Sequence, residues 1–195
     1  MLILASGSPR RKDILRELGV DFKVICTDTD ETSELTDPRL LTEELASRKG
    51  LAVYRLLAER DAQEGASSII ISADTVVYCD GKILGKPQDE EDALRMLTML
   101  SGSTHSVITG VALTVGGVCK SASELTEVRV AEVPREELIR YAKSGEPLDK
   151  AGAYAIQGRF SPWINGINGC YFNVVGLPVH RLNSLYFECT GKYLV

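Results

Sequence analysis

The stretch Leu2-Ile3-Leu4-Ala5-Ser6-Gly7-Ser8-Pro9-Arg10-Arg11 predicts a short apolar strand that runs directly into a helix. A helix start presents unpaired N–H groups, which favour anions and disfavour cations, so two arginines in the first turn are unexpected. One interpretation is that Ser8 caps the helix and both arginines point into water. The other is that Arg10 and Arg11 help to bind an anion such as phosphate.

The composition is that of an ordinary globular protein. With 195 residues, 44% hydrophobic and 25% charged, the chain can bury one sizeable core, and we predict a single domain over residues 1–195. The net charge of −5 argues against a nucleic-acid or anionic-membrane binder, which usually carries excess Lys and Arg. The five widely spaced cysteines predict neither disulfides nor a zinc site. No signal peptide or long apolar run is evident, so we expect a cytoplasmic protein.

Hydrophobic spacing and turn residues divide the chain into strands and helices. Strands are predicted at residues 2–5, 22–26, 68–72, 76–78, 82–84, 106–115, 118–133 and 170–175, and helices at 9–18, 38–60, 89–100, 134–144 and 178–190. The acidic segment 27–34 is predicted to be a loop placed to line a cleft. Residues 164–166 are predicted to form a turn. Segment 145–158 mixes charge with glycine, which indicates either a binding loop or structural turns.

Two charged residues stand out against this pattern. Lys49 lies on the apolar stripe of the helix at 38–60. Its stem can pack while the ammonium reaches water, or the ammonium can meet an anion in a pocket, because an unpaired buried charge is very costly. Asp74 follows the apolar run 68–72, which is typical of a central strand covered on both faces. Ligands of open α/β sheets bind at the carboxyl ends of strands, so Asp74 is a candidate catalytic or metal-binding carboxylate.

Taken together, the polar outliers are the residue types that phosphate chemistry needs. They are the cations Arg10, Arg11, Lys49 and Lys86 and the carboxylates Glu31 and Asp74, with Asp149 and Lys150 as a further pair. Cations neutralise phosphoryl oxygens, carboxylates hold a hard divalent ion, and a carboxylate can deprotonate an attacking water. No Walker A or G-x-G-x-x-G motif is present. Neither His105, predicted to be structural, nor His180 indicates a covalent nucleophile, so direct attack by water is favoured.

Several blocks, in order over nearly the whole chain, resemble the Maf-type nucleoside triphosphate pyrophosphatases. They are Ser6-Gly7-Ser8-Pro9-Arg10-Arg11, Glu31, Lys49, Ser72-Ala73-Asp74-Thr75-Val76-Val77, Leu84-Gly85-Lys86-Pro87, Leu100-Ser101-Gly102, Asp149-Lys150-Ala151-Gly152-Ala153-Tyr154 through Gly158, and Val174-Val175-Gly176-Leu177-Pro178. The resemblance implies a mixed α/β fold with an elongated sheet flanked by helices and a central cleft, usually as a homodimer. It also implies hydrolysis of a nucleoside triphosphate to the monophosphate and pyrophosphate with a divalent metal cation, Mg²⁺ or Mn²⁺.

The resemblance also implies residue roles. Asp74 looks like the proton acceptor for the attacking water, Glu31 and Asp74 look like metal-associated carboxylates, and Lys86 is counted with them as catalytic. The implied substrate-binding residues are Ser8, Arg10, Arg11, Lys49, Thr75 and Gln157. Within the family, Arg10, Thr75 and Gln157 resemble the branch that acts on dTTP and UTP rather than a sister branch that acts on 7-methyl-GTP. The Gln157 amide offers both a donor and an acceptor, which suits a uracil or thymine edge.

Two other functions fit the same residues. One is a hydrolase of deaminated purine triphosphates such as ITP, which substrate ranking would distinguish. The other is a non-catalytic nucleotide sensor or division-related regulator, which would bind UTP without releasing product. Asp74 and Glu31 together favour an enzyme, because binding alone needs fewer carboxylates beside an anion.

Overall fold

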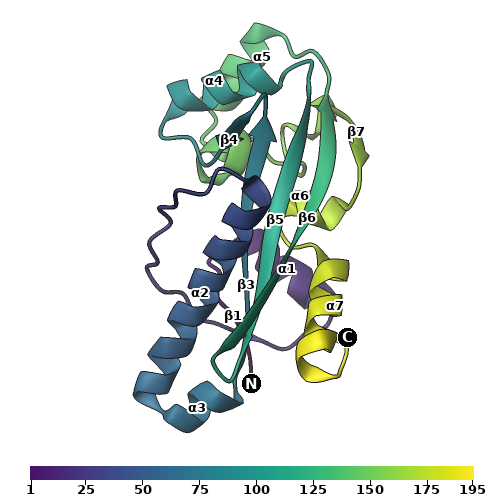
Figure 1. The fold of residues 1–195 in the computed structure, drawn as a ribbon. Helices are drawn as coiled ribbons and strands as arrows, with labels where there is room; N and C mark the ends of the chain where they lie inside the picture. Colours follow the sequence, from purple (N-terminus) through teal and green to yellow (C-terminus); the bar gives the residue numbers. More distant parts are fainter. The chain divides into compact units, whose positions relative to one another are not determined.

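The computed structural model describes residues 1–195, which form two compact units (Figure 1). Unit 1 comprises Met1–Asp74, Thr109–Glu124 and Gly176–Val195, and unit 2 comprises Thr75–Ile108 and Leu125–Val175. The chain passes between the units four times. Three passages lie within the strands β3 (Ile69–Cys79), β5 (Thr104–Val115) and β6 (Val118–Val130), and the fourth lies between Val175 and Gly176. The single domain over residues 1–195 stays a prediction.

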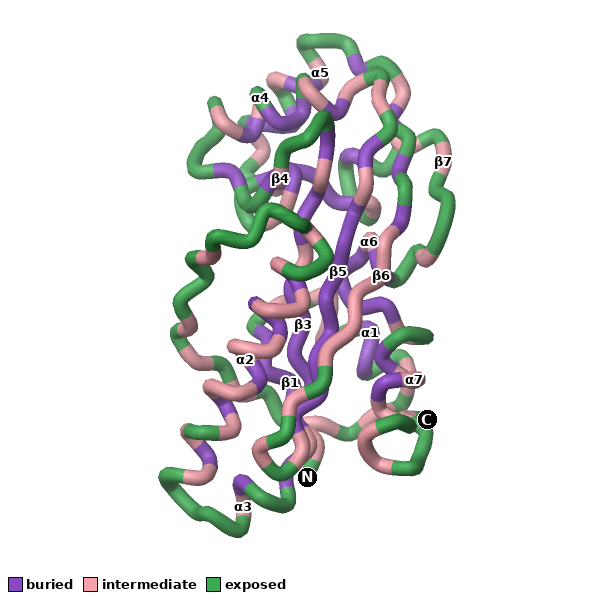
Figure 2. Tube along the Cα trace, in the orientation of Figure 1, coloured by how far each residue is buried: buried purple, intermediate pink, exposed green.

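Unit 1 begins with the strand and helix that the opening stretch predicts. Its elements are β1 (Leu2–Leu4), α1 (Pro9–Glu17), β2 (Lys23–Val24), α2 (Pro38–Arg60), α3 (Ala62–Ser67), parts of the three shared strands, and α7 (Val179–Thr190). The apolar stripe of α2 packs on the strands, and one buried cluster joins Ile3, Ala5, Val53, Leu57 and Ile70. Strands β1, β3 and β5 are therefore largely buried, whereas both residues of β2 are exposed and no residue of the loop 27–37 is buried (Figure 2).

Two glycines set how closely α2 approaches the strands of unit 1. A Cβ added at Gly50 would lie 2.8 Å from the Ser72 hydroxyl, and one added at Gly110 would lie 2.3 Å from the backbone of Thr42. Any larger residue would push the helix away, so glycine is required for this approach. The Ser72 hydroxyl fastens the contact by donating to the Ala46 carbonyl at 2.6 Å.

Unit 2 is built from short elements around a separate core. They are β4 (Lys82–Leu84), α4 (Glu90–Leu100), α5 (Arg135–Ala142), three short 3₁₀ helices at 146–149, 151–153 and 161–163, β7 (Ile164–Asn168) and α6 (Tyr171–Val175). A two-residue turn joins β3 to β4, because Asp80 and Gly81 both adopt positive φ angles, as a type I′ turn requires. The core of unit 2 includes Tyr141, Tyr154 and Phe160, and the Phe160 ring contacts both tyrosine rings.

The sheet contains both parallel and antiparallel neighbours. Its strand order is β2-β1-β3-β5-β6-β7, with β4 paired to β3. β1 runs parallel to β2 and to β3, whereas β4 is antiparallel to β3 and β7 is antiparallel to β6. The predicted mixed α/β fold, a sheet with helices beside it, is therefore confirmed.

Four local predictions are wrong. The strand predicted to end at residue 72 continues through Cys79, so Asp74 lies within β3 and not at its carboxyl end. Residues 164–166 belong to strand β7 instead of a turn, and the segment predicted as a strand at 170–175 forms helix α6. The strand predicted to reach residue 133 ends at Val130.

None of the helices combines the length and apolar character needed to cross a bilayer.

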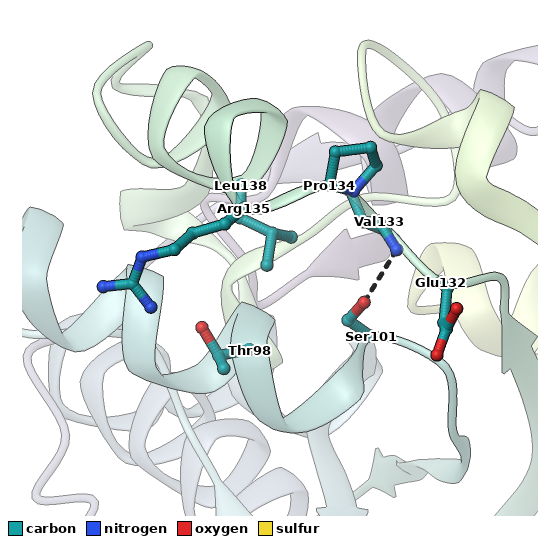
Figure 3. Close-up of a pocket in the computed structure, with 7 residues that line it drawn as sticks. All are labelled: Thr98, Ser101, Glu132, Val133, Pro134, Arg135 and Leu138. Atoms are coloured by element: carbon teal, nitrogen blue, oxygen red, sulfur yellow. Dashed lines mark hydrogen bonds between the residues drawn. The ribbon is translucent and has the colours of Figure 1, made fainter.

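Unit 2 also contains a pocket of about 460 Å³ beside α4 and α5 (Figure 3). Its lining residues are Thr98, Ser101, Glu132, Val133, Pro134, Arg135 and Leu138. The Ser101 hydroxyl already accepts a hydrogen bond from the Val133 N–H at 2.8 Å. No predicted site residue lines this pocket.

Candidate active site

Lys49 joins the two carboxylates that the sequence singles out. Its Nζ atom lies 2.5 Å from Asp74 Oδ1 and 2.7 Å from Glu31 Oε1. The Lys49 and Asp74 side chains are only 19% and 12% exposed, whereas the Glu31 side chain is 55% exposed. Of the two interpretations of Lys49, the one in which its ammonium meets an anion is therefore confirmed, and the anions are carboxylates of the same chain.

The packing of α2 places this ammonium over β3. Lys49 directly precedes Gly50, where an added Cβ would lie 2.8 Å from the Ser72 hydroxyl. Ser72 and Asp74 lie two residues apart on β3, so their side chains lie on the same face of the strand. The glycine contact thus fixes both the helix that carries the amine and the strand face that carries the carboxylate.

Arg11 belongs to the same group of charges. Its Nε donates to the Gly176 carbonyl at 2.7 Å, and its Nη1 donates to the Ser6 hydroxyl at 3.0 Å. Burial lowers the pKa of the Arg11 guanidinium, while Asp74 and Glu31 raise it and Arg10 lowers it. Arginine keeps its proton in proteins, so Arg11 remains a cation close to both carboxylates.

The start of α1 differs from the capping interpretation. Ser8 stands at the N-cap position of α1, as the capping interpretation has it, but its side chain makes no hydrogen bond to the helix. Its N–H donates instead to the Ser6 hydroxyl at 3.3 Å, which also accepts from Arg11. Neither arginine is fully exposed: Arg10 and Arg11 are both half-buried. The interpretation in which both point into water is therefore wrong for Arg11, which is tied to Ser6 and Gly176.

The loop that carries Glu31 is fastened to α2 by residues that the sequence analysis did not identify. Arg48 Nη1 donates to the Thr32 carbonyl at 2.6 Å, and the Ser33 hydroxyl donates to Glu44 Oε2 at 2.6 Å. Glu44 and Arg48 also pair with each other at 2.5 Å, one turn apart on the helix. Their spacing of four residues is the one sequence signal that could have identified this pair.

Three further predicted site residues lie in unit 2. Thr75 follows Asp74 on β3, and Lys86 is exposed on the turn after β4, where the Gly85 carbonyl accepts from the Gly152 N–H at 2.9 Å. Gln157 is exposed, and its Nε2 donates to the Tyr171 hydroxyl at 3.1 Å. The structure thus brings Arg10, Arg11, Glu31, Lys49 and Asp74 into one group of charges within unit 1. The roles of all these residues, and of Ser8, stay predictions.

The segment 145–158 is held together by its own charged residues. Lys150 Nζ donates to the Glu146 carbonyl at 2.5 Å and pairs with Asp149 at 2.5 Å. Glu146 also accepts from the Tyr141 hydroxyl at 3.1 Å and from the Arg159 N–H at 3.3 Å. These contacts order the segment that ends in Gln157 and Gly158.

Glu31 and Asp74 are also candidate ligands for a divalent cation. No cluster of three or more His, Cys, Asp or Glu side chains is arranged to hold a metal ion. Glu31 and Asp74 supply two hard oxygen donors, both within 2.7 Å of one ammonium nitrogen. Mg²⁺ typically uses one or two carboxylates and takes its other ligands from water and substrate phosphate. The donor set therefore fits a cation that binds together with a phosphate ligand.

Comparison with known proteins agrees with these features. The model of the Maf-like protein family matches residues 1–188. A dTTP/UTP pyrophosphatase of Symbiobacterium thermophilum is 48% identical over 181 residues, which cover 92% of this chain and 89% of the relative. One of Koribacter versatilis is 47% identical over 182 residues, covering 93% and 90%. One of Thermococcus onnurineus is 45% identical over 190 residues, covering 96% and 98%.

Proposed function

Because the chain belongs to the Maf-like protein family, we propose that it is a nucleoside triphosphate pyrophosphatase acting on dTTP and UTP. The reaction releases the nucleoside monophosphate and pyrophosphate. The observation that carries the proposal is the contact of the Lys49 ammonium with both Asp74 and Glu31, close to Arg11. This group contains cations that can neutralise a polyphosphate. It also contains carboxylates that can accept a proton from water or bind a metal ion.

The proposed role of Asp74 is to accept the proton of the attacking water. It is an acceptor on a rigid strand, and its burial limits the number of positions that a water molecule can occupy beside it. Lys49 holds this carboxylate in one orientation through a 2.5 Å contact. When a triphosphate binds, the Lys49 ammonium and the Arg11 guanidinium can turn part of their hydrogen bonding to phosphate oxygens.

A divalent cation, Mg²⁺ or Mn²⁺, is part of the proposal. When bound, it would supply Lewis-acid neutralisation of the phosphoryl oxygens. Glu31 and Asp74 are the residues that would hold it. Because Glu31 is more than half exposed, its carboxylate can leave Lys49 for another partner at little cost in packing. The implied homodimer is a separate matter, which sedimentation analysis tests.

The proposal is tested with a panel of dTTP, UTP, CTP, GTP and ITP, each with Mg²⁺ or Mn²⁺. We expect pyrophosphate and monophosphate from dTTP and UTP, identified by ³¹P NMR so that stepwise loss of phosphate is recognised. A preference for ITP would favour the hydrolase of deaminated purine nucleotides instead. Saturable UTP binding without any product would favour a nucleotide sensor and would contradict the proposed reaction.

A further inference from the structure

Glu44 and Arg48 form a brace that connects α2 to the loop carrying Glu31. Arg48 Nη1 lies 2.6 Å from the Thr32 carbonyl oxygen and 3.4 Å from the Asp30 carbonyl oxygen. Glu44 Oε2 accepts from the Ser33 hydroxyl at 2.6 Å, and Glu44 Oε1 pairs with Arg48. The brace therefore contacts the residues on both sides of Glu31.

The Glu31 side chain is held by its ion pair with Lys49, whereas the backbone of its loop lies outside every helix and strand. Residues 27–37 form no helix or strand, and none of them is buried. The Thr32 N–H donates to Asp30 Oδ1 at 2.8 Å, which closes a local turn around Glu31. That turn fixes the local conformation and does not connect it to the rest of unit 1. The contacts to Glu44 and Arg48 do, because both residues lie on the long helix α2.

The brace and the site share one helical segment. Lys49, which contacts the Glu31 carboxylate, directly follows Arg48, which contacts the Glu31 backbone neighbours. The ionised form of Glu44 is favoured, because the Ser33 hydroxyl and Arg48 lower the pKa of its carboxyl group. Glu44 is thus a charged acceptor for both the loop and the arginine.

We infer that Glu44 and Arg48 are positioning residues, which hold the Glu31 carboxylate where it can act on the metal and the polyphosphate. This inference rests on the proposed function. Neither residue is assigned a contact with substrate: each acts through Glu31. Residues that orient a metal ligand typically contribute about 10- to 100-fold to metal affinity or activity, although their own contacts are indirect.

The test is Arg48→Met, compared with Arg55→Met as a matched control. Arg55 lies on the same helix and is exposed, so its replacement removes the same charge without touching the loop. We expect Arg48→Met to lower kcat about 10-fold and to raise the Mg²⁺ concentration for half-maximal rate, as loss of an orienting residue does. We expect Arg55→Met to change neither. Glu44→Gln should behave like Arg48→Met, with a smaller effect because the amide oxygen can still accept from Ser33.

A double variant separates positioning from a general effect on the fold. If Arg48 acts through Glu31, Arg48→Met should reduce kcat in the wild-type background and cause no further reduction in Glu31→Gln. An equal reduction in both backgrounds would overturn the inference.

Hydrogen exchange of the amides in residues 27–36 provides a measurement that needs no turnover. We expect faster exchange in Arg48→Met and unchanged exchange in Arg55→Met. If the amides of residues 27–36 exchanged at the wild-type rate in Arg48→Met, the inference would be overturned, whatever the kcat of the variant. An inactive wild-type protein would contradict the proposed function alone, and loss of protection in Arg48→Met would still support the brace.

Discussion

Unit 1 gathers charged side chains around β3, whereas unit 2 buries neutral polar and aromatic side chains in its core. In unit 1, Lys49 contacts Asp74 and Glu31 at hydrogen-bond distance, so each partly buried charge has an opposite charge beside it. In unit 2, His105 Nε2 meets the Tyr154 hydroxyl at 2.7 Å, and burial lowers the pKa of the imidazole to about 4. Around β3 in unit 1 the partly buried polar atoms belong to paired charges, whereas in the aromatic core of unit 2 they belong to neutral groups.

Under the proposed function, this difference predicts that the reacting groups lie mainly among the charges of unit 1, with Lys86 as the predicted catalytic residue of unit 2. A polyanion and a divalent cation can exchange partners with charges that are already present, whereas a neutral core offers them nothing. The variant with the largest expected effect on kcat is Asp74→Asn. Its amide retains a side-chain oxygen for Lys49 but cannot accept a proton from the attacking water. We expect kcat to fall about 10²- to 10⁴-fold, the usual contribution of a general base, with little change in melting temperature.

The matched control for this variant lies in unit 2. Asp92 on α4 pairs with Arg95 at 2.7 Å, and its pKa is lowered by its hydrogen bonds although burial raises it. Asp92→Asn removes a carboxylate that is paired like Asp74, so kcat should stay at the wild-type value. A wild-type kcat in Asp74→Asn, measured by pyrophosphate release, would remove Asp74 from the reaction and with it the assignment of reactivity to unit 1.

Much of the element order is predictable from residue spacing. The apolar stripe predicts the helix at 38–60, and the structure has it at Pro38–Arg60, with the Asp37 side chain as its N-terminal cap. Asp74 illustrates the limit. Aspartate is rare in strands, so the sequence predicts a strand end there, but β3 continues because Asp74 is paired with Lys49 from a different element. Short apolar runs such as 170–175 fit a strand and a helix equally well, and there the helix forms.

The site was predictable to the extent that its residues break a local pattern. Lys49 interrupts an apolar stripe, and the two arginines oppose the helix dipole, so both signals are visible in one sequence. Glu44 and Arg48 break no pattern, because charged residues four apart are common on exposed helix faces. Their partners are two main-chain carbonyls and a serine hydroxyl, which leave no trace in the sequence.

Gly50→Ala tests whether the α2 contact fixes the charged group in unit 1. The new Cβ would lie 2.8 Å from both the Ser72 and the Thr114 hydroxyl oxygens, and both side chains are buried. We expect a loss of about 2–3 kcal/mol in unfolding free energy, toward the upper end for overpacking, together with a lower kcat because Lys49 is displaced. Urea denaturation and pyrophosphate release measure the two effects.

Gly85→Ala in unit 2 is the control, since a Cβ there meets no atom within 4 Å. Its unfolding free energy should match that of the wild type. If Gly50→Ala were equally stable, the close approach of α2 to β3 would not be what holds the amine over the carboxylate.

His105 provides a pH test of the neutral core in unit 2. Burial lowers the pKa of its imidazole from 6.5 to about 4, so the folded protein holds it neutral while the unfolded chain takes up a proton below 6.5. The contribution of neutral His105 to the unfolding free energy is therefore fully present above the pKa of 6.5 in the unfolded chain. It is lost as the pH falls toward the pKa of about 4 in the folded protein. The loss attributable to this residue between pH 7 and pH 5 is about 2 kcal/mol.

The measurement is the unfolding free energy of the wild type and His105→Gln at both pH values. Glutamine does not titrate and can still meet the Tyr154 hydroxyl, so the variant should lack this part of the pH dependence. Parallel pH profiles for the two proteins would mean that the imidazole is not held neutral, and the contrast with the paired charges of unit 1 would disappear.

The smallest predicted effect concerns recognition in unit 2, through Tyr171 and Gln157. Uracil presents an N–H between two carbonyls, whereas cytosine presents a ring nitrogen acceptor beside an amino group, so one orientation of the Gln157 amide cannot suit both. The Tyr171 hydroxyl accepts from Gln157 Nε2 at 3.1 Å and so favours one orientation. Tyr171→Phe should lower the ratio of kcat/KM for UTP over CTP by roughly 2- to 10-fold, the worth of one hydrogen bond.

The control is Tyr193→Phe, which alters an exposed tyrosine of unit 1 stacked on Phe187 and should leave the ratio unchanged. An unchanged ratio in Tyr171→Phe would separate Gln157 from base selection and leave unit 2 without a recognised contact to the pyrimidine.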